Sequence, residues 1–170
     1  MTERRLRLIL SRHAKSAWDN PDLEDHERIL NARGLRQARE LGDWLASRGY
    51  DPEEVLCSSS KRTRQTWDRV ESAVLATRPD VHILHRLYNA GPDLLLSAVR
   101  GATMPVVMVI AHNPGIAEFA AMMVGTPPPD PEFKRYPTSA TSVIDFFEED
   151  WGKVSPGSGQ LLEFFRPTHD

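Results

Sequence analysis

The side chains with the clearest potential for chemistry lie shortly after short apolar segments. They are Arg12, His13, Arg62 and His112. Arginine presents a planar set of N–H donors that suits phosphate, and histidine acts as a nucleophile or an acid/base group near neutral pH. An arginine and a histidine that follow one strand could simply be surface residues without a function. A functional site is indicated only if the segments that carry these residues meet in the fold.

Short apolar runs bounded by polar or turn residues predict the strands of this chain. The predicted strands cover residues 6–10, 54–57, 81–84, 106–111, 142–147 and 161–165. The run 106–111 is apolar without interruption, which is typical of a central parallel strand that is covered on both faces. Residues 154–159 are rich in turn formers and indicate that the last two strands are antiparallel at one edge of the sheet.

Apolar residues at helical spacing predict four helices between these strands. They span about residues 32–47, 61–77, 92–100 and 116–124. Asn31 is the expected N-cap of the first helix, and the second has an apolar face of Trp67, Val70, Val74 and Leu75. Proline and Asp/Asn residues predict loops at 14–28 and 126–133.

Strands and helices that alternate in this order predict a fold of class α/β, in which a mostly parallel sheet with one antiparallel edge carries helices on both faces in three layers. The 170 residues suit one domain, residues 1–170. Because the carboxyl ends of parallel strands share one edge of a sheet, the two histidines and two arginines would converge there.

Such a set predicts a phosphate pocket. Two arginines neutralise a dianion, and the helix after Ser60 adds backbone N–H donors. A neutral histidine can attack phosphorus and carry the phosphoryl group, while a second, protonated histidine stabilises charge on the phosphoryl oxygens. This chemistry requires neither a metal nor a cofactor.

Other reaction classes lack their motifs. A metal could use the histidines with Asp19, Asp22, Asp25 or His26, but no HExxH spacing is present and nearby arginines disfavour a cation. No G-x-S-x-G elbow or Walker A loop occurs. Cys57, the one cysteine, lies in an apolar run and is expected in the core.

Composition restricts the partners and the compartment. The net charge is −3, so no overall positive field favours nucleic acid or an acidic membrane. The first apolar run is shorter than the core of a signal peptide, and no apolar stretch could span a bilayer. With one cysteine and no possible internal disulfide, we expect a soluble cytoplasmic protein.

Three ordered motifs resemble the histidine phosphatase superfamily, also called phosphoglycerate-mutase-like. They are Arg12-His13 after the first strand, SSSKRTRQT at 58–66 and AHNPG at 111–115. RHAKSAW (12–18) and DHERILNARG (25–34) are similar to its small branch of SixA-type phosphohistidine phosphatases. The resemblance covers roughly residues 6–125, and it implies a phosphoglycerate-mutase-like fold.

Carried onto this sequence, the resemblance implies that His13 is the phosphorylated nucleophile and that His112 completes the pocket. Arg12 and Arg62 would bind the phosphoryl oxygens, with Arg28 as a third phosphate ligand. Ala14, Ser59 and Ile29 depart from the commonest family residues at their positions, glycine for the first and proline for the other two. None of these departures removes a catalytic atom.

The general acid is not apparent. The loop 86–91 holds no carboxylate, so Asp19 and Asp25 are the candidates for an acid or a pocket residue, against the favoured alternative of solvated loop carboxylates.

An imidazole leaving group needs a proton less than an alkoxide does, since its reference pKa is about 6.5. This favours phosphohistidine on a protein, such as a phosphorelay domain, as substrate. A small phosphate ester handled by a phosphomonoesterase or mutase is the alternative, followed by a non-catalytic phosphate-binding module. Lys15 and Trp18 lie beside the predicted pocket without a catalytic role.

Overall fold

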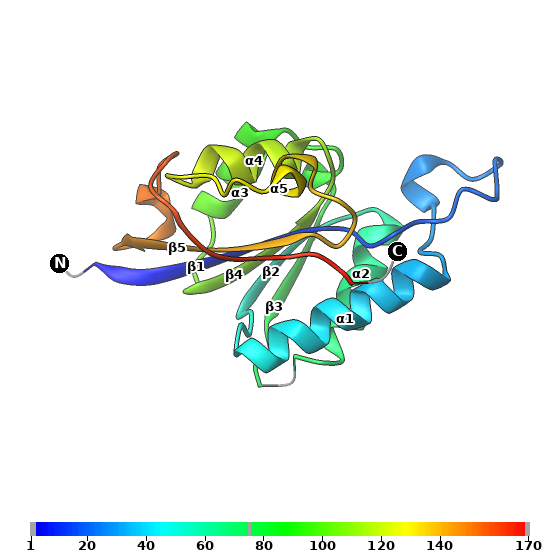
Figure 1. Ribbon diagram of the computed structural model, residues 1–170, viewed down its shortest axis with the longest axis horizontal. Helices are drawn as coiled ribbons and strands as arrows, with labels where there is room; N and C mark the ends of the chain where they lie inside the picture. The colour runs from blue at the N-terminus through cyan, green and yellow to red at the C-terminus, as the bar shows by residue number, and fades with distance from the viewer. Residues whose placement is uncertain (1–2, 75, 169–170) are drawn as a thin grey trace.

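Six strands form one sheet in the computed structural model, which describes residues 3–74 and 76–168 (Figure 1). The strands are β1 (Arg4–Arg12), β2 (Glu54–Ser58), β3 (Asp80–Leu84), β4 (Val106–Ala111), β5 (Thr141–Glu148) and β6 (Gln160–Phe165). Their order across the sheet is β3-β2-β4-β1-β5-β6. β1 to β4 are mutually parallel, and β5 and β6 add the antiparallel edge. The predicted strands and the central place of β4 are confirmed.

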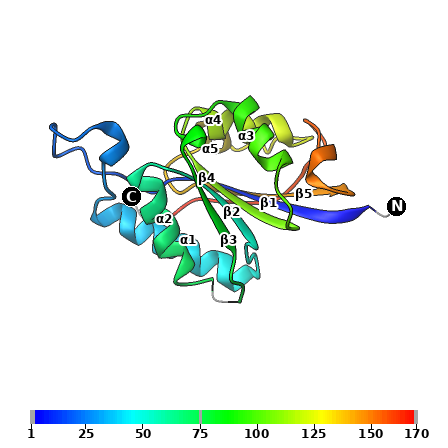
Figure 2. The same cartoon turned by 180° about the vertical axis from the view of Figure 1, so that it is seen from behind.

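Helices cover both faces of this sheet (Figures 1 and 2). They are α1 (Ala32–Arg48), α2 (Lys61–Glu71), α3 (Pro92–Arg100), α4 (Gly115–Met123) and α5 (Pro131–Arg135). α1 and α2 pack on one face over Ile9, Val55 and Met108. α3, α4 and α5 lie on the other face, over Leu8, Leu10 and Val109. Alternate residues of one strand thus enter opposite cores, which explains why β1 and β4 have continuous apolar runs.

Two predicted boundaries are wrong. α2 ends at Glu71 rather than near residue 77, because the Ser72 hydroxyl donates to the Arg69 carbonyl at 2.8 Å and competes with continued helix. Val74 is still buried, whereas Leu75 lies outside the described residues. The predicted loop 126–133 contains the start of α5, where the Asp130 side chain accepts from the Glu132 N–H at 2.9 Å.

Two glycines allow chain segments near the carboxyl edge of the sheet to approach closely. A Cβ at Gly34, in the first turn of α1, would lie 2.0 Å from the Lys15 carbonyl oxygen. A Cβ at Gly115, at the start of α4, would lie 1.8 Å from the Ala90 carbonyl oxygen. Glycine at both positions therefore holds the segments after β1 and β3 against the helices beside the site.

No helix among residues 3–74 and 76–168 combines the length and the apolar character needed to cross a membrane.

Candidate active site

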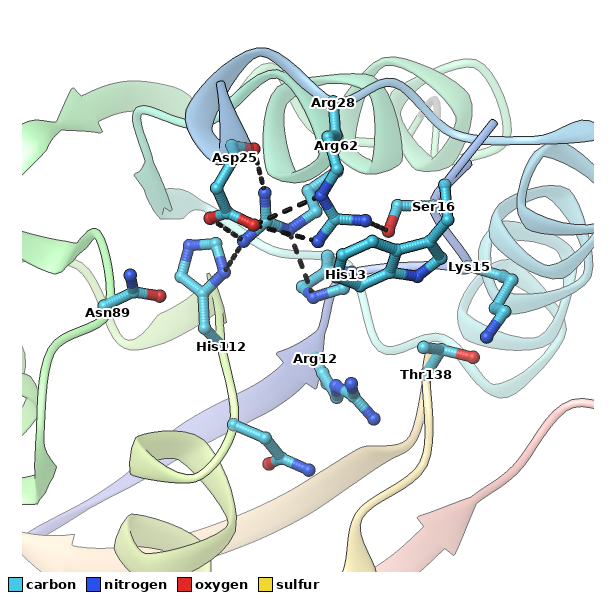
Figure 3. Close-up of a pocket in the computed structure, with 12 residues that line it drawn as sticks. Arg12, His13, Lys15, Ser16, Asp25, Arg28, Arg62, Asn89, His112 and Thr138 are labelled. Atoms are coloured by element: carbon cyan, nitrogen blue, oxygen red, sulfur yellow. Dashed lines mark hydrogen bonds and ion pairs between the residues drawn. The ribbon is translucent and has the colours of Figure 1, made fainter. Parts of the chain in front are cut away.

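The carboxyl ends of β1, β2 and β4 border a pocket of about 360 Å³ (Figure 3). Six residues singled out from the sequence line it. They are Arg12, His13, Asp25, Arg28, Arg62 and His112. The predicted convergence is therefore confirmed as geometry, because parallel strands carry these side chains to one edge of the sheet.

His13 has one ring nitrogen available to the pocket. Its Nδ1 lies 2.7 Å from the carbonyl oxygen of Ala14, so Nδ1–H donates to that carbonyl and the lone pair belongs to Nε2. Nε2 in turn accepts from Nε–H of Arg62 at 3.4 Å. Burial, together with the nearby arginines, holds the pKa of His13 well below its usual value. The ring is therefore neutral at physiological pH, and its free lone pair is on Nε2.

Arg62 contacts both histidines from the first turn of α2. Besides its bond to His13, its Nη2 lies 3.3 Å from Nδ1 of His112 (Figure 3). Ser60 caps the helix by accepting from the Thr63 N–H, which fixes the turn that carries Arg62. The guanidinium is almost fully buried and therefore acts as a fixed positive charge between the two rings.

Arg12, at the end of β1, has the most uncommitted donors of the pocket arginines. Its Nη1 donates to the Tyr136 carbonyl at 3.3 Å, whereas its buried Nε has no hydrogen-bond partner among the described residues. Burial and the charge of Arg62 lower its pKa. The side chain is half-buried and forms no ion pair among the described residues, and a desolvated charge is costly unless an opposite charge joins it, so Arg12 suits an anionic ligand in the pocket.

His112 follows β4 and is held by Ser58 at the end of β2. The Ser58 hydroxyl lies 2.7 Å from its Nε2. Because Nδ1 accepts from Arg62, Nε2 carries the proton and donates to this hydroxyl. Burial and Arg62 lower the pKa of His112 to about 3. His112 is therefore neutral in the protein alone, and the predicted protonated state belongs to the complex, in which the charge of a bound dianion would favour protonation.

Asp25 lies at the pocket edge in the 3₁₀ turn Asp25–Glu27 and joins two arginines. Its Oδ1 accepts from Nε and Nη2 of Arg28 at 3.1 and 3.0 Å, and its Oδ2 accepts from Nη2 of Arg62 at 3.0 Å. The Tyr88 hydroxyl also donates to Oδ2.

These contacts settle the charge of Asp25. Burial of its carboxyl would raise its pKa, but the hydrogen bonds from Tyr88, Arg62 and Arg28 outweigh that effect and hold it well below its usual value. Asp25 is thus a carboxylate and has no proton to give to a leaving group at neutral pH. Asp25 is still a partly solvated loop carboxylate, with 46% of its side chain exposed, but it also lines the pocket and binds two of its arginines.

Arg28 is buried in the pocket wall rather than solvated. Its Nη1 donates to the Ser16 hydroxyl at 2.6 Å, and its guanidinium lies 3.5 Å from the centre of the Trp18 ring. Stacking on an aromatic face and multiple donors hold this arginine in one orientation. Asp19 differs from these residues, because it lies in a separate hollow on the outer side of the loop.

Sequence reasoning missed Tyr88, Ser16 and Ser58 as parts of the site. Tyr88 holds Asp25 and places its ring edge against His112, with ring centres 5.4 Å apart. Its position in a loop without periodicity gave no signal, whereas the position of Ser58 at a strand end could have given one. Lys15 and Trp18 line the pocket as expected. Among the described residues, no group of three His, Cys, Asp or Glu side chains is arranged to hold a metal ion.

Comparison with known proteins extends the resemblance to nearly the whole chain. Residues 8–90 match the family model of the histidine phosphatase superfamily (branch 1). An uncharacterized protein of Mycobacterium leprae is 31% identical over 165 residues, which cover 92% of this chain and 99% of that relative. An uncharacterized chloroplastic protein of Arabidopsis thaliana is 31% identical over 163 residues, 90% of this chain and 72% of that relative.

Solved structures agree with this assignment. A protein from Agrobacterium tumefaciens, provisionally named phosphohistidine phosphatase SixA, matches with a TM-score of 0.79 and 29% identity over 95% of this chain and 98% of that chain. The protein histidine phosphatase SixA complexed with tungstate shares the fold, with a TM-score of 0.75 and 23% identity over 95% of this chain and 97% of that chain. With its three motifs joined in one pocket, this chain belongs to the histidine phosphatase superfamily, in the SixA-like branch.

Proposed function

We propose that this phosphoryl hydrolase works through a phosphohistidine formed on Nε2 of His13, and that its substrate is phosphohistidine on a protein. The orientation of His13 is the observation that carries the proposal. The bond from Nδ1–H to the Ala14 carbonyl leaves the Nε2 lone pair facing the arginines of the pocket. Nucleophilic catalysis needs this arrangement of a neutral, oriented ring beside anion-binding groups.

In the first step, Nε2 of His13 attacks phosphorus and the bond from phosphorus to the leaving group breaks, with the electron pair going to the leaving group. In the second step, water attacks the phosphorus of the phosphorylated His13. The bond from phosphorus to Nε2 breaks, and inorganic phosphate and neutral His13 result. Arg12, Arg28 and Arg62 bind the phosphoryl oxygens throughout, and His112 adds a donor once the dianion favours its protonation. These steps use only side chains, without a metal or a cofactor.

The state of Asp25 supports phosphohistidine rather than an ordinary phosphate ester. An alkoxide leaving group needs an acid, and the carboxylate of Asp25 is held ionised by Tyr88, Arg62 and Arg28. A phosphorylated imidazole departs as the neutral ring when its other nitrogen carries a proton, which solvent can supply near the reference histidine pKa of about 6.5, so this leaving group needs no dedicated acid. Asp25 then serves to orient the two arginines, which is a positioning role.

Trapping of the phosphorylated enzyme tests the mechanism. The wild-type protein is mixed briefly with a phosphohistidine-bearing protein and quenched in base, and the modified residue is located by mass spectrometry. We expect phosphate on His13, and we expect both this signal and phosphate release to be lost in His13→Ala. Undiminished release by His13→Ala would contradict the nucleophile.

A substrate panel tests the substrate class. We expect faster turnover of phosphohistidine protein than of phosphoserine or sugar phosphates. A sugar phosphate hydrolysed far faster than phosphohistidine would instead favour the small-molecule phosphomonoesterase. Binding of phosphate without any turnover would favour the non-catalytic module.

A further inference from the structure

The segment between β1 and α1 projects away from the sheet and its helices, as both views show (Figures 1 and 2). An antiparallel bridge between Ser16 and Leu30 closes its base, and the Ala17 N–H donates to the Ile29 carbonyl at 2.8 Å. Residues 17–29 between these anchors form a loop that carries Asp25 and Arg28 at its inner side. Because Asp25 and Arg28 belong both to this loop and to the pocket wall, the rest of the loop surface lies close to the catalytic pocket.

Three large apolar side chains of this loop are exposed. Trp18 is 72% exposed, Leu23 40% and Ile29 43%. Leu23 and Ile29 line a hollow of about 240 Å³ together with Arg28, which also lines the catalytic pocket, as does Trp18. We call Trp18, Leu23 and Ile29 the loop patch. Exposed apolar side chains gathered on one surface are typical of an interaction site, and Arg28 lines both this hollow and the pocket where the phosphoryl group would bind.

Uncompensated negative charge surrounds the loop patch. The side chains of Asp19, Asp22 and Glu24 are exposed, and they form no ion pair within the part of the chain that the structure describes. The pocket beside them is cationic through Arg12, Arg28 and Arg62. A bound partner would thus place a dianion in the pocket and would gain further attraction from basic groups opposite the acidic residues.

We propose that the loop patch docks the substrate protein, a folded domain whose phosphohistidine lies on an apolar surface flanked by lysine or arginine. This inference rests on the proposed function and adds to it the surface that recognises the partner. A small phosphate compound in the pocket would leave Leu23 and Ile29 uncovered, because neither residue lines the pocket, whereas a protein surface around the phosphoryl group can also cover the adjoining hollow that they line. Apolar contacts with a charged rim are the usual composition of such an interface.

The experiment compares two substrates that share the same labile bond. One is a histidine-containing phosphotransfer domain phosphorylated with phosphoramidate, with lysine or arginine flanking its phosphohistidine, and the other is free phosphohistidine. Leu23→Ser and the double variant Asp22→Lys/Glu24→Lys are measured against Phe147→Ser. Phe147 is a matched control because it is 51% exposed and pairs with Arg5 in β1, toward the end of the sheet opposite the pocket.

For Leu23→Ser we expect kcat/KM on the phosphorylated domain to fall about tenfold, which corresponds to about 1.4 kcal/mol of lost contact. Turnover of free phosphohistidine should be unchanged, which also shows that the variant folds. The double lysine variant should lower kcat/KM on the domain and reduce its dependence on salt, because screened attraction is removed. Changing the basic residues of the domain to glutamate should have the same effect on the wild-type enzyme.

Equal losses on both substrates, or no loss on the domain, would overturn the docking role and leave the proposed function intact. A wild-type dimer that dissociates in Leu23→Ser would also overturn it, because the loop patch would then join two copies of this chain. Failure of the wild-type protein to hydrolyse either phosphohistidine substrate would overturn the proposed function, and this inference with it.

Discussion

Arg62 and Asp25 are joined by two hydrogen bonds, from Nη2 to the carboxylate at 3.0 Å and from Nη1 to the Asp25 carbonyl at 2.7 Å. The same carboxylate accepts two bonds from Arg28. The carboxylate of Asp25 thus takes three hydrogen bonds from these two arginines. A phosphoryl group that binds Arg28 and Arg62 must compete with Asp25 for their donors.

We therefore expect Asp25→Asn to bind inorganic phosphate more tightly, by about threefold or more, because the competing charge is lost and donors are released. The measurement is the inhibition constant of phosphate during turnover. Asp19→Asn, which removes a carboxylate of the same loop outside the pocket, should leave this constant unchanged. Weaker phosphate binding by Asp25→Asn would show instead that orientation of the arginines by Asp25 dominates.

Arg12 differs from Arg28 and Arg62, whose donors bind Asp25, because its buried Nε has no hydrogen-bond partner among the described residues. Arg12→Met approximates the length of the side chain and removes a half-buried charge that forms no ion pair within the described part of the chain. We expect the free energy of unfolding to rise by about 1 kcal/mol, while phosphate binding is largely lost. Denaturant unfolding with and without phosphate measures both effects. A variant that is less stable than the wild type would contradict this account of Arg12.

Substitution of Gly34, which is not a catalytic residue, should cause a strong steric clash. In Gly34→Ala the new methyl group would lie 2.0 Å from the Lys15 carbonyl oxygen, so α1 or the segment after His13 must move. We expect a loss of about 2 kcal/mol or more of stability together with lower activity. Gly101→Ala is the control, because its added methyl group would be 3.5 Å from the nearest atom outside its neighbours. Equal stability of the two variants would contradict the close approach seen at Gly34.

The strands and the meeting of the site residues could be predicted, because both depend on apolar runs and on the residues that follow them. The runs 54–57 and 106–111 predicted the bounds of β2 and β4 nearly to the residue. Because Arg62 and His112 follow these two parallel strands, their meeting at one edge of the sheet could also be predicted. The role of Gly34 was not visible, since its first-turn position indicates only a tolerable cost in helix propensity.

The environment of Asp25 depends on contacts with Arg62 and Tyr88, which lie 37 and 63 residues away in the chain. No local pattern encodes such a long-range pair, and the loop that carries Asp25 has no periodicity. Its carboxylate could therefore be named as a candidate from the sequence, but its fixed negative charge could not be predicted.

The pKa of His112 makes stability depend on pH in a defined direction. Its pKa is lowered to about 3 by burial and by Arg62, whereas an unfolded histidine titrates near about 6.5. Between these values the unfolded chain binds more protons, so the stability present above about pH 6.5 is lost as the pH falls toward 3, by up to about 1.4 kcal/mol per pH unit for this residue. We expect His112→Asn, which can still bond to Ser58, to show a shallower loss of stability across this window in denaturant unfolding at several pH values. A His112→Asn curve parallel to that of the wild type would show that His112 is not held neutral in the folded protein.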